Sequence, residues 1–119
     1  MANEVTVSVS LSFSKSTVSD ALSWSDLQFD VTGSKMIHHV QAVTTGVMVI
    51  DKGDIGTPGW IIGINRDDTN YVDIIGVNTE TATARVEAGE PFLFRLASSA
   101  PEFQANTSTC TVEYLLIED

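Results

Sequence analysis

The chain is poor in basic residues. It has 6 Lys and Arg against 16 Asp and Glu, which gives a formal net charge of -10. Nucleic-acid-binding proteins gain most of their affinity from Lys and Arg side chains that neutralise phosphates. An anionic membrane repels an acidic surface in the same way. The composition therefore argues against direct binding to a nucleic acid or to a membrane.

Cysteine and long apolar runs are also scarce. Cys110 is the only cysteine, so no disulfide can form within the chain. No apolar run approaches the ~20 residues of a membrane-spanning helix. The first ten residues, MANEVTVSVS, lack the basic region and apolar block of a secretory signal. We expect a soluble protein made in a reducing cytoplasm.

Helical periodicity is missing over any convincing length, whereas strand periodicity is clear. The odd positions from Val5 to Phe13 are Val, Val, Val, Leu and Phe, and the even positions from Thr6 to Ser14 are Thr and Ser. Alternation with a period of two predicts a strand with one buried face.

Further strands follow along the chain, separated by polar or glycine-rich turns. We expect them at about Ser25 to Val31, Trp60 to Ile64, Tyr71 to Val77, Ala82 to Glu87, Phe92 to Leu96 and Thr109 to Ile117. The segment from Met36 to Ile50 fits either two strands interrupted near Thr45 and Gly46 or one long bent strand. Turns are predicted at 14–20, 51–59, 65–70 and 88–91, where Gly, Pro, Asn and Asp collect.

Short strands with turn signals about every ten residues are typical of a β-sandwich or barrel. The length of 119 residues suits one domain. We therefore predict an all-β fold, an antiparallel and jelly-roll-like β-sandwich with few or no helices, formed by residues 1–119 as a single domain.

The sequence contains no recognisable set of catalytic residues. His38 and His39 are neighbours on a predicted strand and point to opposite faces, so they are poorly placed to share a metal ion. Cys110 falls on the apolar set of its strand and is expected in the core. The aspartates near two loops (Asp51, Asp54, Asp67, Asp68 and Asp73) lack EF-hand spacing, and turn formation is favoured over a cation site. We predict no enzyme activity, no cofactor and no metal.

Two smaller questions stay open in the sequence. Arg95 interrupts an apolar strand. If its side chain is buried, it needs an acidic partner, and the candidates are Asp68, Asp73 and Glu90. The alternative is that Arg95 lies on an exposed rim. Four aromatic residues (Trp24, Trp60, Tyr71 and Phe103) are expected mainly in the core, and a sugar-binding platform is the alternative.

The second half resembles small virion structural proteins of tailed bacteriophages. The residues that carry the resemblance are Gly59-Trp60, the run from Asn65 to Val72, Ala88-Gly89-Glu90-Pro91 with Phe94-Arg95-Leu96, and Ala105-Asn106-Thr107 leading to Val112 through Asp119. The chain departs from the pattern at 81–86, where the family commonly has a more hydrophobic strand. The order and spacing of these elements carry the resemblance, since no single element is specific.

The resemblance implies a non-enzymatic virion protein made in the host cytoplasm and located on the outside of the particle. A capsid decoration protein that forms a homotrimer and docks on the major capsid protein or another virion protein is the leading expectation. A tail or fibre accessory protein and a carbohydrate-binding β-sandwich are the alternatives. Expected structural or interface residues are Asn65, Asp68, Asn70, Tyr71, Gly89, Glu90, Arg95, Leu115 and Ile117. Leu115 and Ile117, if they point outward, are expected to pack against a neighbouring subunit.

Overall fold

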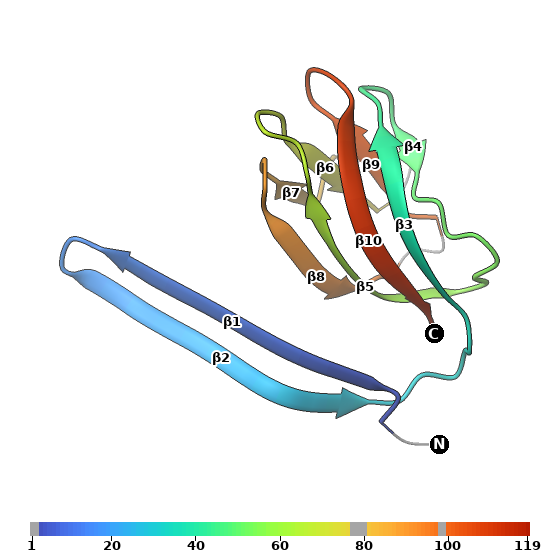
Figure 1. The fold of residues 1–119 in the computed structure, drawn as a ribbon, viewed down its shortest axis with the longest axis horizontal. Coiled ribbons are helices and arrows are strands. Elements are labelled where there is room, and N and C mark those ends of the chain that lie inside the picture. The colour runs from blue at the N-terminus through green and yellow to red at the C-terminus, as the bar shows by residue number, and fades with distance from the viewer. Residues whose placement is uncertain (1–2, 77–80, 98–99) are drawn as a thin grey trace. The chain divides into compact units, whose positions relative to one another are not determined.

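The computed structural model of the chain describes residues 3–76, 81–97 and 100–119. These residues contain ten strands and no helix, which confirms the all-β class (Figure 1). The strands are β1 (Val5–Lys15), β2 (Val18–Phe29), β3 (Met36–Val43), β4 (Met48–Val49), β5 (Pro58–Asn65), β6 (Val72–Ile75), β7 (Ala84–Val86), β8 (Pro91–Arg95), β9 (Glu102–Ala105) and β10 (Cys110–Glu118). The described part of the chain has no helix that could cross a membrane.

The chain divides into two compact units, Met1–Thr32 and Gly33–Asp119, where the sequence predicts a single domain over 1–119. The first unit holds the two-stranded sheet of β1 and β2, and the second holds the other eight strands in two sheets. The division follows from strand pairing, because β1 and β2 pair only with each other in the described chain.

The second unit is a β-sandwich of two four-stranded antiparallel sheets, with strand orders β3-β10-β5-β8 and β4-β9-β6-β7. Its strand pairs are nested along the chain: β3 pairs with β10, β4 with β9, β5 with β8, and β6 with β7. An eight-stranded, double-sheet arrangement wound in this way is a jelly roll. The predicted jelly-roll-like sandwich is therefore confirmed for 33–119.

The core of the sandwich lies between the two sheets. Its fully buried side chains include Val43, Val112 and Leu116 from one sheet and Phe103 from the other. Phe92 packs against this cluster, 6.2 Å from Phe103 between ring centroids. Alternate residues of β10 point inward, as the period of two requires.

The hairpin turn is much shorter than predicted. The segment 14–20 was expected to be a turn, but β1 extends to Lys15 and β2 begins at Val18, leaving Ser16 and Thr17 to close the hairpin. Ser16 has a φ of 56°, as tight hairpin turns require. The expectation of a buried apolar face on β1 is wrong for a single chain, since Leu11 is 76% exposed.

The structure decides one open strand prediction in the sandwich and corrects two others. The stretch from Met36 to Ile50 forms two strands with a break between Val43 and Met48, which is the first of the two alternatives for this segment. The short strand β9 was not predicted, because it follows Pro101 and its four residues are too few for their alternation to stand out. The strand expected at Tyr71 to Val77 spans only β6, and Val77 lies outside the described residues.

Candidate functional site

The outward side of the β3-β10-β5-β8 sheet is largely apolar. Cys110, Val112, Tyr114 and Leu116 of β10 are buried, so the alternate residues Leu115 and Ile117 lie on the opposite side and are partly exposed. We call six of the apolar residues on this side the outer-sheet patch: Met36, Val40, Ile62, Leu93, Leu115 and Ile117.

Strand register joins these residues into one surface. His38, Leu115, Ile62 and Leu93 lie opposite one another in turn across four neighbouring strands. Ile117 lies opposite Met36 in the adjacent row. The sequence led us to expect apolar residues on both faces of the last strand, and the outward ones form the centre of this patch.

A charged cluster borders the outer-sheet patch. Glu113 Oε2 lies 2.7 Å from His38 Nε2, and Glu113 Oε1 accepts a hydrogen bond of 2.6 Å from Arg66 Nε. A second ion-pair contact joins the same carboxylate to Arg66 Nη2. The hydrogen bonds from His38 and then Arg66 hold the pKa of Glu113 below its ordinary value. Both partners come from other strands or loops, so the cluster ties β10 to β3 and to the end of β5.

Arg95 sits at another border of the patch. Its Nη2 lies 2.5 Å from Asp119 Oδ1, and both side chains are partly exposed. The proposed partners Asp68, Asp73 and Glu90 are wrong, because strand register places Arg95 opposite Trp60, near the chain terminus. The exposed-rim alternative for Arg95 is the one observed.

Asn65 is a buried structural residue rather than an interface residue. Its Nδ2 lies 2.9, 3.1 and 3.3 Å from the carbonyl oxygens of Asn70, Val86 and Glu87. Its Oδ1 accepts a hydrogen bond of 3.0 Å from the amide of Asp67. The side chain therefore joins the end of β5 to the turn that follows it and to the end of β7.

The turn after Asn65 is organised by Asp67, one of the loop aspartates for which the sequence favoured turn formation. Asp67 Oδ2 accepts hydrogen bonds from the amides of Thr69 and Asn70 at 3.0 and 2.7 Å, and these bonds lower its pKa. Asn70 Nδ2 donates to Ser108 Oγ at 2.9 Å. Asp68, one of the expected residues, is exposed beside them. An Asp whose carboxylate binds the amides two and three residues later is a common turn former.

Three other expected residues also lie in local structural roles. The guanidinium carbon of Arg85 lies 3.7 Å from the ring centroid of Tyr71. Gly89 has a φ of 78°, a conformation that favours glycine, and the Glu90 carboxylate accepts a hydrogen bond of 2.9 Å from the Glu87 amide. These residues stabilise turns of the sandwich and do not join the outer-sheet patch.

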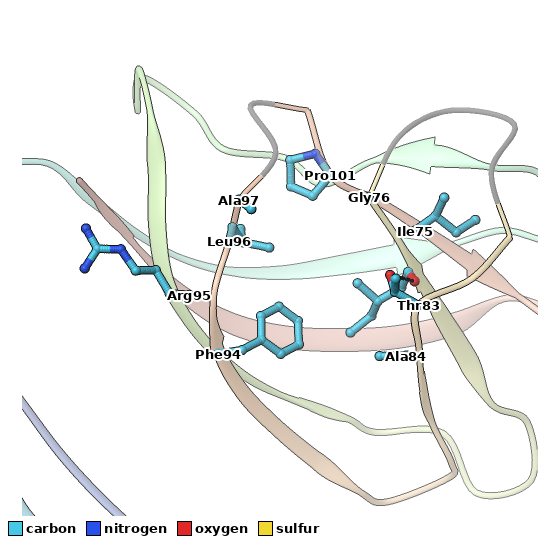
Figure 2. Close-up of a pocket in the computed structure, with 10 residues that line it drawn as sticks. Ile75, Gly76, Thr83, Ala84, Phe94, Arg95, Leu96, Ala97 and Pro101 are labelled. Carbon is cyan, nitrogen blue, oxygen red and sulfur yellow. Dashed lines mark hydrogen bonds between the residues drawn. The ribbon is translucent and has the colours of Figure 1, made fainter.

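A pocket of about 650 Å³ lies between the edge strands β7 and β8 of the two sheets (Figure 2). Its lining residues are Ile74, Ile75, Gly76, Thr83, Ala84, Phe94, Arg95, Leu96, Ala97 and Pro101. Figure 2 shows the guanidinium of Arg95 pointing away from the other lining residues, and Thr83 Oγ1 donates to the Ile74 carbonyl at 3.2 Å. The residues that line the pocket thus offer apolar contact but no paired acid and base.

Two of the polar residues buried in the sandwich, Gln41 and Tyr114, form hydrogen bonds with the backbone of Asp51. The Tyr114 hydroxyl donates to the Asp51 carbonyl, and it lies 3.1 Å from Gln41 Oε1. Burial raises the pKa of Tyr114, and Asp51 adds to this effect. Cys110 is fully buried, as predicted, and burial raises the pKa of its thiol. A phenol and a thiol with raised pKa values are poor nucleophiles.

His38 and His39 point to opposite faces of β3, as predicted. His38 contacts Glu113 on the outer side, whereas the His39 ring packs edge-on against Tyr114 with centroids 5.9 Å apart. His39 Nε2 also lies 3.3 Å from Asp51 Oδ2. Within 3–76, 81–97 and 100–119, no three His, Cys, Asp or Glu residues are grouped as metal ligands.

The four aromatic residues considered for a sugar-binding platform are divided between the two units. Phe103 is fully buried in the core, and Tyr71 is stacked with Arg85. Trp60 lies in β5 and is partly buried, whereas Trp24 belongs to β2 in the other unit. Of the four aromatic residues, Phe103 is therefore closed to a ligand and Tyr71 is already in contact with a guanidinium.

Comparisons with models of protein families, with curated proteins and with solved structures found no match for this chain.

Proposed function

We propose that this chain is a non-enzymatic structural protein of a tailed bacteriophage, which decorates the outside of the capsid as a homotrimer. The observation that carries the proposal is the outer-sheet patch, an apolar sheet face with Ile62 48% exposed near its centre. Exposed apolar patches bordered by charged residues mark protein–protein contacts. We infer that this face packs against the major capsid protein of the particle.

Two further features support the proposal. Jelly rolls are used by viral capsid proteins, although they also occur in lectins and cupins, so this support is an analogy at the level of the fold. The net charge of -10 suits the exterior of a particle, because it disfavours contact with packaged DNA. The resemblance of the second half to small virion proteins points the same way.

The test is binding to heads of the phage that encodes the chain, purified from a mutant that lacks it. Ile62→Thr removes apolar contact from the patch, and Val49→Thr is the matched control, since Val49 is 50% exposed in β4 of the other sheet. We expect Ile62→Thr to weaken head binding by about 10-fold or more and Val49→Thr to change it by less than about 2-fold.

Four outcomes would count against the proposal. Equal binding by both variants would remove the outer-sheet patch as the contact face. Binding of the wild-type chain to purified tails and not to heads would replace decoration by the tail-accessory alternative. Binding to neither would remove the virion role. A number of bound chains per head that is not a multiple of three would contradict the trimer.

A further inference from the structure

The β1–β2 hairpin has one face that is apolar along nearly its whole length. Register places Val5, Val7, Val9 and Leu11 opposite Phe29, Leu27, Trp24 and Leu22. Phe13 and Val18 continue this face toward the turn. The opposite face is built mainly of Ser and Thr, for example the facing pair Ser10 and Ser23. We call the apolar side, formed by Val5, Val7, Val9, Leu11, Phe13, Val18, Leu22, Trp24, Leu27 and Phe29, the hairpin face.

The hairpin face is open to solvent in a single chain. From Val9 onward, its residues are between 37% and 76% exposed. A two-stranded hairpin is at best marginally stable in water by itself, and soluble monomers rarely leave large contiguous apolar patches uncovered. The face therefore requires a covering surface.

The size of the face matches one half of a stable protein interface. The exposed fractions of its eight large side chains correspond to about 800 Å² of accessible surface, given roughly 150–250 Å² for each aromatic side chain and somewhat less for each aliphatic one. A standard specific interface buries about 800 Å² on each partner. Contact with other chains on the scale of one such interface is enough to cover it.

The charges on this face favour a second copy of the same chain. Lys15 lies opposite Val18 and Asp20 lies opposite Phe13, so one positive and one negative side chain flank the apolar residues near the turn. The face is thus neutral in a chain with a net charge of -10, and two copies of it do not repel each other. Lys15 of one copy and Asp20 of another have the opposite signs that an interface rim uses.

We propose that the hairpin face is covered by the same face of other copies, so that β1 and β2 of several chains form a shared hydrophobic core. Sheets that pack face to face in this way lie about 10 Å apart with interdigitated side chains. The inference rests on the self-association in the proposed function and names its surface. It does not depend on the identity of the particle.

The test compares two double variants of the full-length protein. Leu11→Thr with Leu22→Thr removes the central facing pair of the hairpin face, and Ser10→Thr with Ser23→Thr makes the same new residues at the facing pair behind it. Threonine suits strands, and Leu11 and Leu22 are exposed in a single chain, so both variants are expected to fold. Sedimentation equilibrium gives the mass of the species in solution. Acrylamide quenching of Trp24 fluorescence, in a Trp60→Phe background, shows whether the hairpin face is covered.

We expect the wild-type chain to sediment as an oligomer with Trp24 shielded. The Leu11→Thr, Leu22→Thr variant should dissociate at protein concentrations at least about 100-fold higher than those at which the wild-type oligomer dissociates, and Trp24 should become exposed. The Ser10→Thr, Ser23→Thr control should keep the wild-type mass. A wild-type chain that stays at the 12.8 kDa of one chain overturns the proposal, whether Trp24 is exposed or is shielded from within the chain. An oligomer equally stable in both variants also overturns it, and head binding by Ile62→Thr tests the capsid contact separately.

Discussion

Trp24 and Leu27 lie on the same face of the hairpin, although residues three positions apart in an unbroken strand lie on opposite faces. Trp24 is opposite Val9 and Leu27 is opposite Val7, with a bulge between the two pairs. Asp26 in this bulge has a φ of 57°, and its amide donates to Ser8 Oγ at 3.0 Å. The extra residue reverses the alternation and keeps the hairpin face continuous.

The first prediction concerns this bulge. Asp26→Val places a β-branched residue at a positive φ, and we expect it to destabilise the hairpin by about 1–3 kcal/mol. Asp26→Gly meets no such penalty and should keep wild-type stability. Hydrogen exchange of the β1 and β2 amides is the measurement, with roughly 5- to 150-fold faster exchange expected for Asp26→Val. Equal protection in the two variants would show that the bulge conformation does not constrain this position.

The bulge also explains how much of the hairpin could be predicted. The alternation from Val5 to Phe13 was enough to place β1, because it runs unbroken. In β2 the apolar residues Leu22 and Trp24 occupy even positions, whereas Leu27 and Phe29 occupy odd ones. Only the second pair was assigned to a strand, since the change in parity at the bulge hides the continuity. A bulge depends on pairing with another strand, which local periodicity does not contain.

The second prediction concerns the buried amide of Asn65. Asn65→Asp replaces a donor group that faces three carbonyl oxygens with a carboxylate oxygen, and we expect it to cost about 2–4 kcal/mol. Asn106→Asp is the matched control, because the exposed Asn106 uses its Oδ1 to accept from the Tyr71 amide and keeps this acceptor. Urea unfolding at pH 7 compares the two. A cost for Asn65→Asp no greater than that for Asn106→Asp would contradict the structural role.

Only some residues of the candidate site could be predicted, because the others depend on pairing between strands, as the bulge does. Asn65, Gly89 and Glu90 were found because turn chemistry is local. The pairs Arg95 with Asp119 and Glu113 with His38 join different strands or the chain terminus, so they depend on the register of the sheet. Alternation placed Leu115 and Tyr114 on opposite faces of the last strand without deciding which face is outward, and the neighbour Ile62 became known only from the pairing of β10 with β5.

The third prediction concerns Gly63, which faces Phe92 in the sandwich. A Cβ at Gly63 would lie 2.5 Å from Phe92 Cζ and 2.7 Å from the Glu113 carbonyl oxygen, both too close. Gly63→Ala therefore forces Phe92 or the backbone of β10 to move, and we expect a loss of about 1–3 kcal/mol in the free energy of unfolding. Gly46→Ala is the control, since its nearest contact would be 3.9 Å away. Equal urea midpoints for the two variants would mean that the sheet relaxes at no cost.

The last prediction concerns Glu118, whose carboxylate accepts hydrogen bonds from the amides of Gly56 and Ser34 at 2.9 and 3.2 Å. These bonds, the one from Gly56 first, lower its pKa from 4.5 in the folded protein. The unfolded chain therefore binds this proton more readily, so the stabilisation is present above pH 4.5 and is lost as the pH falls through the lower folded pKa. Glu118→Gln should lose stability at pH 7, and its deficit relative to wild type should shrink toward about pH 3. Urea midpoints at both pH values measure the deficit, and an NMR titration of the Glu118 carboxyl should give a midpoint below 4.5. A deficit that does not change with pH would show that the charge of Glu118 contributes nothing to the fold.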